Sequence, residues 1–318
     1  MYVYGPVPSR RLGRSLGVSP IPPKTCSYTC VYCQLGRTTC LQATRERFFP
    51  KTDILSEIML KSQKIKSDFI TFVGDGEPTL CRDLGWLIRE TKNKRPLSTA
   101  VITNGSLLFH RDVREDLKEA DIVIPTLDAG NEKTFQAVNR PHRDIDFATM
   151  LQGQVSFRHE YSGQIWLEVM LVKGLNDSEK ELHSIKNAVD MIKPDRVYVL
   201  TPIRPPAESW VQPSDPEDIL IARDIIGNVK SLTGLENGRF GLGEFTDARQ
   251  AILEIGSRHP LRLMQAVDIE NEFRQENVIR QMLENRELIQ VNYKGEKYLL
   301  PGRFKRGPKN RRKKENTK

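Results

Sequence analysis

Three cysteines within eight positions constrain this chain more than any other feature. Cys26, Cys30 and Cys33 lie in the segment KTCSYTCVYCQLG, and the 318-residue sequence holds only two other cysteines. Five cysteines make a poor disulfide framework for a chain of this length, whereas reduced thiols are available as metal ligands. The sequence therefore predicts a metal centre in this segment.

The spacing of the three cysteines favours iron-sulfur chemistry over a structural zinc site. Structural zinc usually has four ligands, often as paired Cys-x-x-Cys segments, and the sequence shows no second pair. Three thiolates at this spacing can bind three irons of a four-iron cluster. The fourth iron would then be open to a substrate or a cofactor.

Apolar strand-like runs alternate with helix-like segments over the first two thirds of the chain. The six runs are 15–21, 68–74, 98–105, 121–128, 164–172 and 196–203. Strands that are apolar almost throughout are typical of a parallel sheet covered by helices, and repeated βα units favour a sheet that curls towards a barrel. We therefore predict an α/β fold, a partial (βα)6 TIM-like barrel, with its chemistry at the carboxyl ends of the strands.

A Gly-rich link separates the predicted barrel from a smaller C-terminal unit. We place the barrel at residues 1–232, ending in a helix over 213–232, and the linker at 233–245. Three helices followed by two alternating strands around a Lys-Gly turn predict a winged-helix-like domain at 246–302.

The third of these helices, expected at about 271–284, is the one that would read a nucleic-acid groove. The residues expected to face outward from it are Arg274, Gln275, Arg280 and Gln281. Because the same helix carries Glu272, Glu276 and Glu284, a small docking or dimerisation module stays an open alternative.

The net positive charge is confined to the C-terminal tail. The chain holds 49 Lys and Arg against 41 Asp and Glu, and nine of the former and one of the latter lie in residues 303–318, so residues 1–302 are neutral. We expect so polar a tail to be disordered, and a block of like charge is typical of proteins that bind phosphate backbones. Contact with nucleic acid and a solubilising role both stay open.

The sequence predicts a cytoplasmic protein with no membrane partner. No apolar run approaches the roughly 18 to 20 residues that a membrane helix needs. The first residues, MYVYGPVPSRR, lack the pattern of a secretory signal.

The cysteine segment, with Tyr32 just before its last cysteine, resembles the cluster loop of the radical S-adenosylmethionine (radical SAM) superfamily. After the second predicted strand, GDGEP at 74–78 is similar to the Gly-Gly-Glu-Pro element of that family. The resemblance implies a [4Fe-4S] cluster on Cys26, Cys30 and Cys33 whose open iron binds SAM, and a 5′-deoxyadenosyl radical that abstracts hydrogen from a substrate. It also implies an electron donor such as flavodoxin or ferredoxin.

Other residues match family positions near SAM, several of them at strand ends. The resemblance implies cofactor-binding roles for Tyr32, Gly74, Gly76, Glu77, Asn104, Asp128 and Glu168. Glycines let the backbone approach a ligand closely, and Glu77 or nearby carbonyl groups can accept hydrogen bonds from the SAM ammonium group. Taken alone, Asn104 and Asp128 are also common turn residues, and Glu168 could face solvent.

Cys81 and Arg204 are the candidate catalytic residues, with Cys81 expected near the pocket and Arg204 on its substrate side. Cys81 follows Glu77 by four positions, and Arg204 follows the sixth predicted strand. A guanidinium group can bind a carboxylate or a phosphate through two hydrogen bonds.

Residues 5 to about 210 resemble the branch of the superfamily that contains the tRNA wyosine-base (4-demethylwyosine) synthases. This implies modification of an RNA base, with tRNA or another nucleic acid bound by the winged helix and the basic tail. The sequence departs from that branch in having no cysteine before Cys26. The alternatives are a radical SAM enzyme acting on a peptide or small metabolite, and an iron-sulfur regulator that binds nucleic acid.

Overall fold

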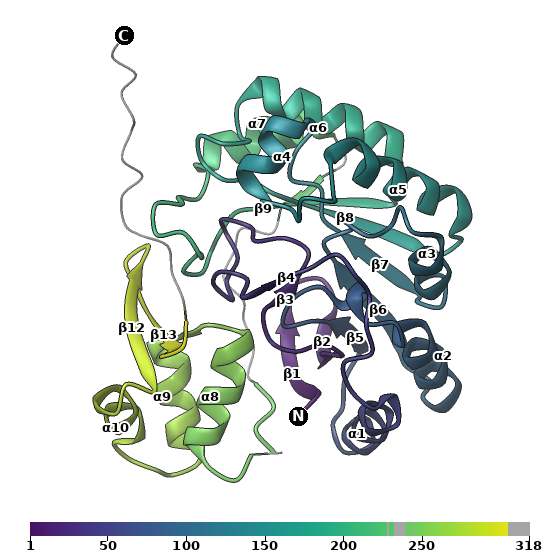
Figure 1. Ribbon diagram of the computed structural model, residues 1–318. Coiled ribbons are helices and arrows are strands. Elements are labelled where there is room, and N and C mark those ends of the chain that lie inside the picture. The colour runs from purple at the N-terminus through teal and green to yellow at the C-terminus, as the bar shows by residue number, and fades with distance from the viewer. Residues whose placement is uncertain (228, 232–239, 244, 305–318) are drawn as a thin grey trace.

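The larger part of the molecule is an eight-stranded sheet (Figure 1). The computed structural model describes residues 1–227, 229–231, 240–243 and 245–304. The strand order is β1-β2-β5-β6-β7-β8-β9-β10, and all neighbours are parallel except β1 and β2, which are antiparallel. The strands are β1 (Val3–Ser9), β2 (Gly13–Val18), β5 (Phe69–Val73), β6 (Ser98–Thr103), β7 (Ile122–Pro125), β8 (Gln164–Met170), β9 (Arg196–Leu200) and β10 (Val229–Ser231).

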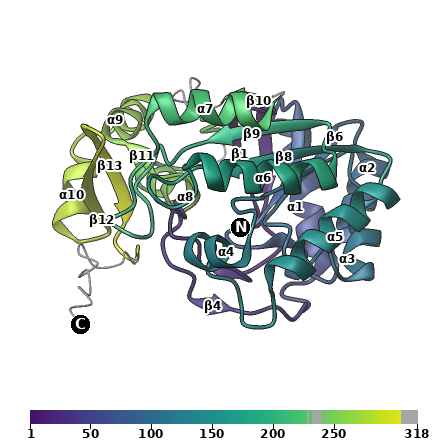
Figure 2. The same cartoon turned by 90° about the horizontal axis from the view of Figure 1, so that it is seen from above.

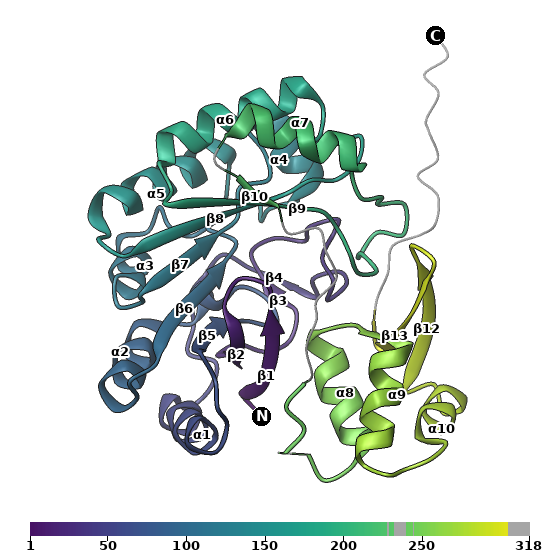
Figure 3. The same ribbon diagram turned by 180° about the vertical axis from the view of Figure 1, so that it is seen from behind.

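The sheet is open and curved, and most of the helices lie along its outer face (Figure 3). Because side chains alternate along a strand, one set packs against the helices and the other faces the inner side. Val199 belongs to the large core, for example, whereas Tyr198 and Leu200 belong to a separate inner cluster. The helices are α1 (Lys51–Lys64), η1 (Pro78–Leu80), α2 (Leu84–Lys94), α3 (Arg111–Leu117), α4 (Glu132–Val138), α5 (Phe147–Glu160), α6 (Glu179–Ile192) and α7 (Pro216–Ile226).

The six predicted strands correspond to β2 and β5 to β9, and the predicted α/β class with a parallel sheet is confirmed. Strands β1 and β10 were not predicted. The glycine and prolines of VYGPVPS hide the alternation of β1, which has an irregular register between Tyr4 and Val7. The predicted helix over 213–232 is wrong at its end, because α7 stops at Ile226 and Gly227, with φ of 73°, leads into β10.

A short strand pair lies on the inner side of the curved sheet (Figure 3). It consists of β3 (Thr25–Cys26) and β4 (Cys40–Leu41), which are parallel. The loop between them holds the other two clustered cysteines. The carboxyl ends of the barrel strands open towards the same loop.

The C-terminal unit lies beside the barrel and has a core of its own (Figure 2). Its sheet has the antiparallel order β11-β13-β12. Its elements are α8 (Ala248–Arg258), β11 (Leu261–Arg262), α9 (Leu263–Glu272), α10 (Val278–Glu284), β12 (Leu288–Tyr293) and β13 (Glu296–Pro301). Residue 232 at the end of the predicted barrel, residues 233–239 and 244 of the predicted linker, and residues 305–318 of the predicted tail lie outside the described residues.

The predicted single helix over 271–284 is wrong. Helix α9 runs on to Glu272, and α10 begins only at Val278. Between them, Arg274 and Asn277 adopt left-handed backbone angles, with φ of 53° and 62°, which no α-helix contains. Arg274 and Gln275 therefore lie in a turn.

Across the ranges that the structure describes, no helix combines the length and the apolar character that crossing a membrane would need.

Candidate functional site

The three clustered cysteines lie in one loop at the carboxyl ends of the strands. Cys26 ends β3, and Cys30 and Cys33 follow in the loop that leads to β4. Two tight turns shape this loop, because the Cys33 N–H donates to the Cys30 carbonyl at 3.2 Å and the Gly36 N–H donates to the Cys33 carbonyl at 3.1 Å. Cys40, on β4, is exposed.

The three thiols share one partly buried environment that suits a cationic centre. The Asn104 side-chain amide lies 3.6 Å from the Cys26 sulfur, and the Asn139 amide lies 3.7 Å from the Cys30 sulfur. Burial raises the pKa of each thiol, and the pKa of Cys30 is raised further by Asp128 and by the other two thiols. Such thiols ionise together only when a metal centre compensates their charge.

No three His, Cys, Asp or Glu side chains within the described part of the chain already form a site for a single metal ion. A four-iron cluster is bulkier than one ion, so its thiolates stand farther apart. The donor set therefore fits a cluster: three adjacent thiols, amide donors aimed at two of their sulfurs, and low exposure to solvent.

The Gly74–Pro78 segment packs directly against β3, the strand that carries Cys26. The Glu77 N–H donates to the Thr25 carbonyl at 3.0 Å, and the Lys24 N–H donates to the Asp75 carbonyl at 2.6 Å. At Gly76 a Cβ atom would lie 1.8 Å from the Thr25 carbonyl oxygen. Only glycine permits this close approach of two backbones.

Glu77 is buried and ties η1 to the end of β6. Its carboxylate accepts four hydrogen bonds, from the N–H and hydroxyl of Thr79, the hydroxyl of Thr103 and the N–H of Asn104. Burial raises its pKa, and these donors act in the opposite direction. Because its lone pairs are already engaged, the nearby backbone carbonyl groups are better available for an ammonium group than the carboxylate.

Asp128 is a second buried carboxylate that organises the site. It accepts hydrogen bonds from the Tyr32 hydroxyl at 2.5 Å, the Asn139 amide at 2.7 Å and the Met170 N–H at 2.8 Å. Burial raises the pKa of Asp128 to about 6. Since Tyr32 precedes Cys33, Asp128 fixes the cysteine loop from the end of β7.

Asn104 connects the end of β6 to the start of the cysteine loop. Besides the Cys26 sulfur, its side-chain amide reaches the Ser27 hydroxyl at 2.9 Å. Asn104, Asp128 and Asn139 therefore surround the cysteine loop.

A cavity of about 350 Å³ lies next to the cysteine loop, inside the curve of the sheet. Five of the predicted site residues line it, namely Tyr32, Cys33, Gly74, Glu168 and Arg204. The other predicted residues do not line it. Glu168 shares its strand face with Met170, which also lines the cavity, so the carboxylate points to the inner side.

Glu168 forms an ion pair with Arg11, from the turn between β1 and β2. No pattern in the sequence indicated this pair. The unpredicted strand β1 places its turn over the cavity, which no local pattern in the sequence indicates. Asn139 was likewise missed, because it lies far from the cysteines in sequence.

The two catalytic candidates are placed differently. Arg204 lines the cavity and donates to the Gln34 side-chain oxygen at 2.8 Å, while its other terminal nitrogen lies 2.7 Å from His259 Nε2. Cys81 is buried in the core between the sheet and the helices, where burial raises its pKa to about 11. The structure does not bring Cys81 to the cavity.

Comparison with known proteins gives the family. A family model described as the radical SAM superfamily matches residues 21–184. The UPF0026 protein MJ1312 of Methanocaldococcus jannaschii is 35% identical over 307 residues, which cover 93% of this chain and 95% of that protein. The chain belongs to the radical SAM superfamily and, within it, to the family of the UPF0026 proteins. Members of the superfamily bind a [4Fe-4S] cluster and SAM, as predicted.

Two further similarities are narrower. The protein named GTPase Obg of Brachyspira hyodysenteriae is 47% identical over 205 residues, which cover 64% of this chain and 30% of that protein. The structure of native anSMEcpe with bound AdoMet has a TM-score of 0.51 and 14% identity over 67% of this chain and 58% of that one. The latter likeness concerns the fold alone.

Proposed function

We propose that this protein is an enzyme that cleaves SAM reductively at a [4Fe-4S] cluster held by Cys26, Cys30 and Cys33. The observation that carries the proposal is a loop with three partly buried thiols, the last of which lines a cavity, while Cys40 is exposed and Cys81 lies in the core. The chain thus offers three clustered ligands to the cluster.

When bound, the cluster and SAM supply a 5′-deoxyadenosyl radical to the substrate. The residues of the chain position and shield these groups. Asp128 and Asn104 hold the cysteine loop in place. Gly76 lets the backbone of the Gly74–Pro78 segment approach β3, which carries Cys26. Arg204 and the Arg11–Glu168 pair contribute charged groups to the cavity wall.

Replacing each of Cys26, Cys30 and Cys33 by Ala tests this assignment. We expect each variant, after anaerobic reconstitution, to lose the iron-sulfur absorbance and the formation of 5′-deoxyadenosine from SAM under a strong reductant. Cys40→Ala is the matched control, because its thiol is exposed and outside the cavity, and it should keep both properties.

Retained SAM cleavage in all three variants would overturn the site. A wild-type protein that holds the cluster but forms no 5′-deoxyadenosine would instead favour an iron-sulfur regulator.

For the substrate we propose RNA, with tRNA base modification as the reaction. Two features support it: the basic composition of residues 303–318, and the order α8-β11-α9-α10-β12-β13, which is the helix and strand order of a winged helix. The assignment to the wyosine-base branch stays a prediction, as do a cytoplasmic location and an electron donor of the flavodoxin or ferredoxin type.

A peptide or small-metabolite substrate is the second candidate. It is favoured by α10, a helix of only 7 residues on which Arg280 is already paired with Glu284 at 2.9 Å. A short helix with compensated charge is a weak reader of a phosphate-lined groove.

A further inference from the structure

The C-terminal unit contacts the barrel around the candidate site. Tyr293, the last residue of β12, and Tyr298, on β13, donate hydrogen bonds of 2.9 Å to the carbonyl groups of Pro202 and Ile203, in the loop that follows β9. At the other edge, the Lys24 ammonium group lies 5.1 Å from the centre of the Phe304 ring. Because Pro202 and Ile203 line the cavity, these contacts place the unit next to it.

The carboxyl end of α8 enters the cavity wall itself. Arg258 and His259 both line the cavity, together with Cys33 and Gly74. The Gln34 side chain, directly after Cys33, donates to the Arg258 carbonyl at 3.2 Å. The cysteine loop and α8 are therefore joined on the side of the last cysteine.

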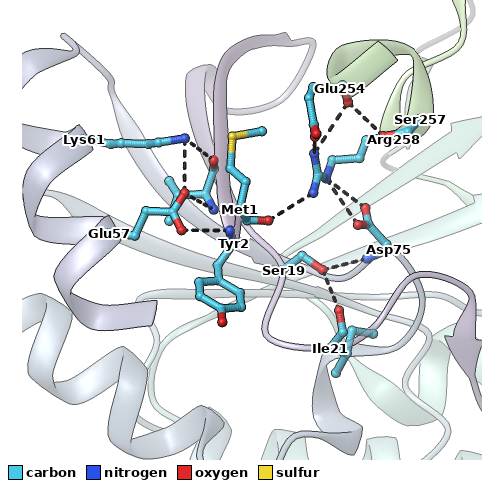
Figure 4. A network of polar contacts seen from close by, with 11 residues as sticks. Met1, Tyr2, Ser19, Ile21, Glu57, Lys61, Asp75, Glu254, Ser257 and Arg258 are labelled. Carbon is cyan, nitrogen blue, oxygen red and sulfur yellow. Dashed lines mark hydrogen bonds and ion pairs between the residues drawn. The ribbon is translucent and has the colours of Figure 1, made fainter. Parts of the chain in front are cut away.

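Arg258 makes the principal side-chain contact between the two parts (Figure 4). Its guanidinium lies 3.1 Å from one Asp75 carboxylate oxygen and 3.2 Å from the other. It also binds Glu254 at 2.9 Å and the Met1 carbonyl at 3.3 Å, and it stacks over the Tyr4 ring. The Arg258 and Asp75 side chains are each 10% exposed, so solvent weakens their attraction little.

Asp75 belongs to the Gly74–Pro78 segment. Its backbone forms hydrogen bonds with Ser19, which follows β2, and with Lys24, which precedes β3. Its N–H donates to the Ser19 hydroxyl oxygen at 3.1 Å, and its carbonyl accepts from the N–H of Lys24, two residues before Cys26. Burial raises the pKa of the Asp75 carboxyl, and Arg258 acts in the opposite direction. Without Arg258, Asp75 would be a buried carboxylate lacking this cation, and its segment would shift to expose it.

We propose that the C-terminal unit is a built-in cap of the SAM cavity, and that Arg258 is the positioning residue that couples docking of this cap to the Gly74–Pro78 segment. The inference rests on the proposed function, since it concerns how the same cavity holds SAM. Arg258 acts through Asp75, and Gly74 of the same segment lines the cavity that would hold SAM.

The test compares four full-length, reconstituted variants with the wild type. Arg258→Gln and Asp75→Asn break the contact from either side, and Arg258→Lys keeps the charge. Arg249→Gln is the matched control, because Arg249 lies on the same helix and is paired with Glu287 inside the C-terminal unit. The measurements are iron content, the dissociation constant for SAM, and the change in the electron paramagnetic resonance spectrum of the reduced cluster when SAM is added.

We expect Arg258→Gln and Asp75→Asn to keep their iron but to bind SAM about tenfold more weakly, with a smaller spectral change. Arg258→Lys should recover part of the affinity, and Arg249→Gln should match the wild type. Hydrogen exchange should rise at residues 74–77 in the two weakened variants, while α8 stays protected. A simple loss of stability would not produce this pattern or the recovery by Lys.

Wild-type SAM affinity and spectra in both Arg258→Gln and Asp75→Asn would overturn the cap. If Arg258→Gln does not fold, Asp75→Asn alone decides, since Asn has nearly the same shape as Asp. A wild type that neither binds nor cleaves SAM would overturn the proposed function, which is a different result.

Discussion

Glu77 shows how one side chain can hold a short helix and the end of a strand together at the site. Two of its four donors are backbone N–H groups, from Thr79 and Asn104, and they bind different oxygens of the carboxylate. A backbone N–H cannot be turned into an acceptor. The side chain at this position therefore needs two acceptor oxygens, which a carboxylate has and a carboxamide does not.

We predict that Glu77→Gln lowers the free energy of unfolding by about 2 kcal/mol, because the side-chain amide of Gln leaves one buried N–H group without an acceptor. Urea unfolding of the reduced, cluster-free protein measures this change. Glu115→Gln is the control, since Glu115 is half exposed and pairs with Lys118 at 2.9 Å. Equal stability of Glu77→Gln and the wild type would contradict the role given to the carboxylate.

At the scale of elements, the contact between the Gly74–Pro78 segment and β3 sets the position of the first cysteine. The two segments approach so closely that no side chain fits at Gly76. This spacing, and not the cysteine motif alone, brings Cys26 to the ends of β5 and β6.

Gly76→Ala should separate the two segments, because the new methyl group would meet the Thr25 carbonyl oxygen and neither backbone can turn aside. We expect a loss of about 2 kcal/mol in stability and reduced iron incorporation. Gly256→Ala, in helix α8, is the matched control. A Cβ atom at this position would meet only Leu261 Cδ1, at 4.0 Å. Wild-type stability and iron content in the Gly76→Ala variant would refute this packing argument.

At the scale of the whole molecule, the proposed cap and the basic tail consist of different residues. The cap acts through residues up to Phe304, which contacts Lys24, whereas eight of the 49 Lys and Arg lie beyond it. Removing residues 305–318 therefore separates the effect of the tail on RNA binding from the effect of the cap on SAM binding.

We predict that this truncation weakens tRNA binding and makes it less dependent on salt, because fewer phosphate groups are contacted. SAM cleavage without RNA should be unchanged, since the cavity lies within residues 1–304. Filter binding over a range of salt concentrations gives both quantities, and a full-length chain with Gln at the basic tail positions serves as the control. Unchanged affinity and salt dependence would remove the tail from the argument for RNA.

The strand at 98–105 and the cluster loop could be predicted from the sequence, because the apolar run and the cysteine spacing are both local patterns. The apolar character of a buried parallel strand and the ligand spacing of a cluster are contained in a few consecutive residues. Strand β1 escaped prediction because Gly5, Pro6 and Pro8 conceal its pattern, and pairing with β2 stabilises it nonetheless.

The sequence by itself determined the α/β class and the cofactor pair of the superfamily, and it predicted Cys26, Cys30 and Cys33 as the cluster ligands. The tertiary structure alone decided which polar residues meet there: Arg11 with Glu168, Asn139 with Asp128, and Arg258 with Asp75. The last of these pairs joins residues 183 positions apart. Contacts of this kind depend on how whole elements pack, and no local pattern of residues carries that information.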